Sequence, residues 1–102
     1  MQLIKKLSAM SEDELDDAEK YVRCALNHKE DRRPLAETFY ALSLDELKHM
    51  NQLHEFVVRL IDEVRQSGTP VPEGMMEMYE YLHERHIEHE KEIRILQKMY
   101  TG

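Results

Sequence analysis

The sequence predicts an all-α protein, with one domain over residues 1–102 that folds as a three-helix up-down bundle and is completed by dimerisation. Apolar residues recur at helical spacing in three long segments, and no segment shows the alternation of a half-buried strand. The chain has only three glycines and three prolines, with 41% hydrophobic and 34% charged residues. That composition is typical of a soluble helical bundle.

The first helix is predicted to end at Asn27 and to begin near either Leu3 or Ser11. The run "SEDE", which starts at Ser11, has the pattern of a capping box and favours the later start. An apolar face that continues through the whole segment favours the earlier start. Its members are Leu3, Leu7, Met10, Ala18, Tyr21 and Ala25.

The second helix is predicted over residues 34–66, after the polar joint "NHKEDRRP", because Pro34 suits the first turn of a helix. It carries two apolar stripes. The main stripe, expected to face the core, contains Leu35, Leu42, Leu53, Phe56 and Leu60. The other contains Leu47, Met50, Val58 and Ile61. A helix with so wide an apolar arc is normally buried from two sides, so we expect a homo-oligomer, a dimer in the simplest case.

The third helix is predicted over residues 72–100, after the loop "SGTPVPEG" with its two prolines and two glycines. Its apolar stripe contains Met75, Tyr79, Leu82, Ile93, Leu96 and Tyr100.

Ionisable residues interrupt or flank the apolar stripe of each helix. They are Glu14 on the first helix, Glu46 and His49 on the second, and His86, His89 and Glu90 on the third. Burying such groups without partners costs several kcal/mol each, whereas a divalent metal ion neutralises carboxylates and accepts imidazole lone pairs. These six residues are therefore the candidate metal ligands. His28 and His54, in a joint and off the main stripe, are expected to bind nothing.

The pattern of a glutamate on one helix and Glu-x-x-His on the next resembles the half-site of the ferritin-like and rubrerythrin-type di-iron carboxylate bundles. The matching residues are Glu14 and the run "ELKH", from Glu46 to His49. The resemblance covers the first two helices. It implies an iron cofactor and an iron-handling or ferroxidase-type role. From positions on the apolar stripes, we expect Glu46 to bridge two iron ions, with Glu14 and Glu90 as terminal ligands and His49 and His86 binding one ion each.

The third helix departs from that family. The family has two further helices, the last with a second Glu-x-x-His, whereas this chain has one further helix with "HIEH" at residues 86–89. Two arrangements stay open. One is a histidine-rich site within one chain. The other is a pair of half-sites pooled by two chains, which resembles the two-helix ferritins of encapsulin compartments.

Other interpretations also stay open. Zinc or manganese would suit the same ligand types, and a hemerythrin-type site would use the His-x-x-x-Glu spacing of His86 and Glu90. From a different class, an oligomeric scaffold module without chemistry would use the buried polar residues as a network that fixes helix register. Chelation separates the classes, because only a metal site loses stability when metal is removed.

The charge balance and the apolar runs restrict partners and location. Asp and Glu total 21 against 14 for Lys and Arg, a formal charge of −7, which argues against nucleic acid and anionic membrane surfaces. The apolar runs are too short to span a bilayer, and the first residues do not resemble a signal peptide. A single cysteine, Cys24, cannot form an internal disulfide, which favours the reducing cytoplasm.

Overall fold

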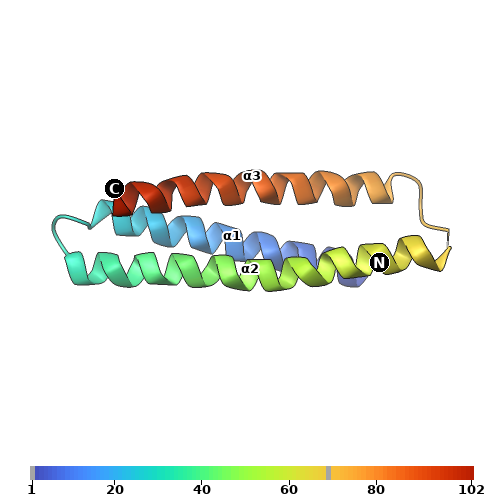
Figure 1. Cartoon of the computed structure of the whole chain (residues 1–102), viewed down its shortest axis with the longest axis horizontal. Coiled ribbons are helices and arrows are strands. Elements are labelled where there is room, and N and C mark those ends of the chain that lie inside the picture. Colours follow the sequence, from blue (N-terminus) through green and yellow to red (C-terminus); the bar gives the residue numbers. More distant parts are fainter. Residues whose placement is uncertain (1, 69) are drawn as a thin grey trace.

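The structure, a computed structural model, describes residues 2–68 and 70–102, and this part of the chain contains three α-helices and no strand. Helix α1 spans Gln2–Asn27, α2 spans Arg33–Ser67 and α3 spans Met75–Thr101. The helices run up, down and up along a rod with extents of 56 × 17 × 17 Å (Figure 1). The all-α prediction is confirmed. A four-helix arrangement is not present within the described residues of one chain.

Helix α1 is continuous, so the prediction of a start near Leu3 is right and the start at Ser11 is wrong. Ser11 is buried inside the helix, and its Oγ donates a hydrogen bond to the carbonyl oxygen of Leu7 at 2.9 Å. A serine that bonds back to the preceding turn cannot cap a helix that starts after it. The capping box is therefore not formed.

Proline and glycine set the ends of the other two helices. Pro34 lies in the first turn of α2, and Gly68 ends that helix with a φ of 69°. Gly74 precedes α3 with a φ of 80°, and residues 72–75 form a turn in which the Met75 amide bonds to the Pro72 carbonyl. Glycine adopts such left-handed conformations at little cost. This turn explains why α3 begins three residues later than the sequence predicts.

Small side chains bring α1 and α2 close together. Ala18 and Ala25 of α1, with Ala36 and Ser43 of α2, are fully buried. The Ser43 hydroxyl donates to the backbone carbonyl of Ala18 at 2.7 Å, a side-chain contact with the backbone of the other helix. In turn, Gln97 of α3 donates to the Ser43 hydroxyl at 3.0 Å. Helix α3 packs mainly on α1, and its contacts with α2 are fewer.

The apolar core lies between these helices along the whole rod. Its central cluster contains Leu15, Ala18, Val22, Leu47, Met50 and Ile93. Two smaller clusters fill the ends of the rod: Ile4, Val57 and Tyr79 at one end, and Ala25, Ala36 and Tyr100 at the other. No helix within residues 2–68 and 70–102 has the length and apolar character needed to cross a membrane.

The face of α2 that was expected to be in the core lies largely outside it. Leu35 is 42% exposed, Leu42 36% and Phe56 53%, whereas Leu47 and Met50 are each 2% exposed. Ala36 and Ser43 explain which face of α2 is turned inward, because these small side chains allow α2 to pack closely on α1. The main stripe contains no such small residues.

Candidate metal centre

Three of the candidate ligands converge between α1 and α2. Glu14 comes from the middle of α1, and Glu46 and His49 come from one face of α2 at i and i+3. The Nδ1 atom of His49 lies 3.7 Å from a carboxylate oxygen of Glu14 and 3.7 Å from one of Glu46. One ligand atom from each residue lies within 4.8 Å of the others. We call these three residues the outer cluster.

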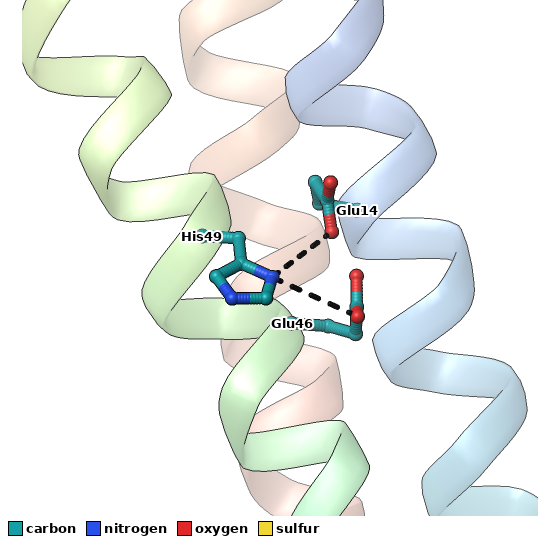
Figure 2. A group of neighbouring side chains, drawn as sticks. All are labelled: Glu14, Glu46 and His49. Atoms are coloured by element: carbon teal, nitrogen blue, oxygen red, sulfur yellow. Dashed lines mark ion pairs between the residues drawn. The ribbon is translucent and has the colours of Figure 1, made fainter.

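The outer cluster opens away from α3. Figure 2 shows Glu14 projecting from α1, Glu46 and His49 projecting from α2 toward it, and α3 passing behind the two helices. The side chains of Glu46 and Glu14 are 17% and 28% exposed, and that of His49 is 54% exposed. The carboxylates are thus partly withdrawn from water, whereas the imidazole lies at the surface.

This arrangement provides two anionic oxygens and one nitrogen for a cation. The distances of 3.7 Å from His49 to the two carboxylates are too long for hydrogen bonds, so the imidazole does not fully satisfy either carboxylate. Carboxylate and imidazole together suit iron, manganese and zinc. These metals take about four to six ligands, so three from one chain leave coordination positions open on the outward side.

Exposed apolar side chains share helix faces with the outer cluster. On α2 they belong to the main stripe, which includes Leu42 and Phe56, and on α1 they include Met10, which is 42% exposed and precedes Glu14 by one helical turn. An apolar surface around a polar centre is typical of an interaction site.

The other three candidates, all on α3, lie apart from the outer cluster. The Nε2 atom of His89 lies 2.7 Å from a carboxylate oxygen of Glu19 on α1. Glu90 is paired with Arg94 on its own helix at 2.6 Å. His86 is buried, with 8% of its surface exposed. The six predicted ligands therefore do not form one site within one chain.

Glu19 is a partner of His89 that the sequence did not identify. Hydrogen bonds from Arg23 and, secondarily, from His89 hold the pKa of the Glu19 carboxyl below its ordinary value, and burial opposes them. Nothing in the spacing along the chain links Glu19 to His89, since the contact depends on how α3 lies on α1.

His54 was expected to bind nothing, yet it faces the interior. Its ring stacks on that of His83 from α3, with ring centroids 4.4 Å apart and an angle of 11° between planes. The signal in the sequence was that His54 follows Leu47 and Met50 at i+7 and i+4, on the face of α2 that is buried. From the sequence, that face was expected to be the second apolar stripe and not the one that faces the core.

No family model, no curated protein and no solved structure matches this chain. The resemblance to ferritin-like proteins therefore depends on the residues of the outer cluster and on their placement.

Proposed function

We propose that the protein is a ferritin-like metal-binding homodimer that handles iron at the outer cluster. The observation that carries the proposal is the convergence of Glu14, Glu46 and His49 from two helices, with ligand atoms within 4.8 Å of one another. Nothing in the packing of three helices requires two carboxylates and an imidazole to converge at this place.

A second copy of the chain is the proposed source of the missing ligands. A twofold axis beside the outer cluster would bring together four carboxylates and two imidazoles, the ligand set of a di-iron carboxylate bundle. The same contact would bury the exposed main stripe of α2, including Leu42 and Phe56. The α1–α2 pairs of the two chains would then form a four-helix arrangement.

Charge makes this dimer dependent on metal. Four carboxylates brought together repel one another, and two divalent ions neutralise them. Iron, when bound, would supply redox chemistry with dioxygen, which corresponds to a ferroxidase-type activity. Three residues of the chain would hold the metal: Glu46 as the shared carboxylate, Glu14 as a terminal carboxylate and His49 as the nitrogen ligand.

The test is metal analysis after anaerobic loading with Fe(II) and desalting. We expect about two iron ions per dimer, lost in Glu46→Ala and retained in the control Glu55→Ala, which removes an exposed carboxylate from the same helix. Oxygen consumption during Fe(II) addition then tests the ferroxidase-type role. Equal iron content in Glu46→Ala and Glu55→Ala would contradict the proposal.

One observation favours the scaffold function as a second candidate. His49 lies at the same 3.7 Å from both carboxylates, so a protonated His49 would be attracted by both without metal. On this alternative the cluster fixes how two chains pack. Dimerisation would then persist in the presence of a chelator.

A further inference from the structure

Three histidines meet between α2 and α3, at a place separate from the outer cluster. His54 comes from α2, and His83 and His86 come from α3 at i and i+3, so that both project from one helix face. The rings of His54 and His83 are stacked face to face at 4.4 Å. We call these three residues the inner triad.

Space for one small ligand adjoins all three rings. A recess of about 10 Å³ is lined by the inner triad together with Ser8, Ser11, Val57 and Tyr79. A second recess of about 20 Å³ shares His54 and His86 and adds Asn51 and Glu90 among its lining residues. Volumes of this size accommodate one water molecule or one ion.

The imidazoles of the inner triad lack partners of their own. Within the described residues, no hydrogen bond or ion pair involves His86, although its side chain is more than nine-tenths buried. His54 and His83, both half-buried, stack on each other, and the described residues provide neither of them with a hydrogen bond or a close ion pair. Among the described residues, the one buried side-chain nitrogen or oxygen without a partner is the Tyr100 hydroxyl, so the ring nitrogens of the inner triad are accessible to water or to a ligand.

Burial also disfavours the protonated form of two of these rings. Desolvation is the main cause that lowers the pKa of both His54 and His86, and the neighbouring His83 lowers both further. Glu90 opposes the shift at His54, and Glu12 opposes it at His86. A neutral imidazole has a free lone pair, which is the form that binds metal.

We propose that His54, His83 and His86 bind a divalent late transition-metal ion of the zinc type, independently of the outer cluster. Three imidazole nitrogens and one water molecule form a common tetrahedral zinc site. A set of three nitrogens without a carboxylate also differs from the oxygen-rich outer cluster, and it favours zinc over ferrous iron.

Binding requires the rings to turn. Among the described residues, only the outer cluster already has three ligand atoms within 4.8 Å of one another. The second side-chain torsion of histidine is broad, so small rotations bring ring nitrogens toward the shared recess. The ion would link α3 to α2, the pair of helices with the fewest direct contacts in the bundle.

The test uses a background without the outer cluster, the double variant Glu46→Ala/His49→Ala, stripped of metal by a chelator. Zn²⁺ is titrated by calorimetry, and Co²⁺ by its visible absorption, which reports tetrahedral coordination. We expect one ion per chain. Adding His83→Phe, which keeps an aromatic ring against His54 but removes the nitrogens, should weaken binding at least about tenfold.

Two controls make the result decisive. His28→Phe removes a histidine of the joint between α1 and α2, and it should leave affinity unchanged. His86→Gln tests the buried ligand, and its helix content is checked by circular dichroism. Absence of zinc binding in the background, or equal affinities in the His83→Phe and His28→Phe proteins, would overturn the proposal. Neither result would bear on iron binding by the wild-type outer cluster.

Discussion

The outer cluster and the inner triad both involve α2, yet they differ in ligands, burial and exposure to a partner. The outer cluster has two carboxylates and one imidazole between α1 and α2, with α3 behind them. The inner triad has three imidazoles in the seam between α2 and α3, and its His86 is 8% exposed. Helix α2, which has two apolar faces, thus places one set of polar residues toward the inside of the bundle and another toward the outside. The inward group depends on the fold of one chain, whereas the outward group is open to a second chain.

The largest expected effect compares the two faces of α2 directly. Leu47→Ala removes a side chain that is 2% exposed and should lower the free energy of unfolding by about 2–5 kcal/mol. Leu42→Ala, on the outward face, should cost the monomer less than about 1 kcal/mol but weaken dimerisation. Urea unfolding measures the free energy of unfolding, and analytical ultracentrifugation measures dimerisation. Equal losses of stability would mean that the outward face is buried within one chain.

Removing metal with a chelator should reveal what the outer cluster contributes to stability and dimerisation. At a metal concentration of about 100 times Kd, binding stabilises the folded state by about 2.7 kcal/mol. Chelation should therefore lower the melting temperature by about 10 °C for a domain of this size and shift dimer to monomer. In Glu46→Ala, which lacks one carboxylate of the outer cluster, the same chelator should not change the oligomeric state. A dimer that withstands chelation would favour the scaffold function.

Acid should act on the inner triad in metal-free protein. The folded chain holds the pKa of His54 and His86 below the ordinary 6.5, so the unfolded chain binds more protons near that pH. Stability should therefore be full above pH 6.5 and should fall as pH drops below it. Denaturant unfolding between pH 5 and pH 8 in chelator measures the slope, and His54→Phe should reduce it. A free energy of unfolding that increases as pH falls below 6.5 would contradict this prediction.

The smallest effect concerns the contact between Glu19 and His89, which belongs to neither group of ligands. Because the pKa of Glu19 is lowered, its contribution is present above its ordinary value of 4.5 and is lost as pH falls further. The pair is partly exposed, so Glu19→Gln should cost only about 0.5 kcal/mol at pH 7. A double-mutant cycle with His89→Gln measures the coupling. Loss of iron in Glu19→Gln would show that this pair also supports the outer cluster.

The sequence predicted the helices better than it predicted their orientation. Pro34, Gly68 and Gly74 mark helix ends because their effects act on the local backbone, and α2 was placed within one residue at each end. The choice between two starts for α1 was harder, since Ser11 suits both a cap and an interior hydroxyl. Only the packing of α1 on its neighbours selects the interior role, in which Ser11 is buried.

The outer cluster and the inner triad show the same limit. Glu46 and His49 share a face by their spacing alone, so they could be paired from the sequence. His54 could not be matched with His83, because they lie on different helices and their contact requires α3 to approach α2 at one particular height.

By itself, the sequence determined three helices, an acidic surface charge and a glutamate–histidine pair on one face of α2. Only the tertiary structure decided that Leu47 faces inward and Leu42 outward, that Glu14 meets Glu46, and that three histidines share one seam. The physical reason is that helical period fixes angles around one helix axis, while the small residues Ala18 and Ser43 decide which faces of α1 and α2 approach each other.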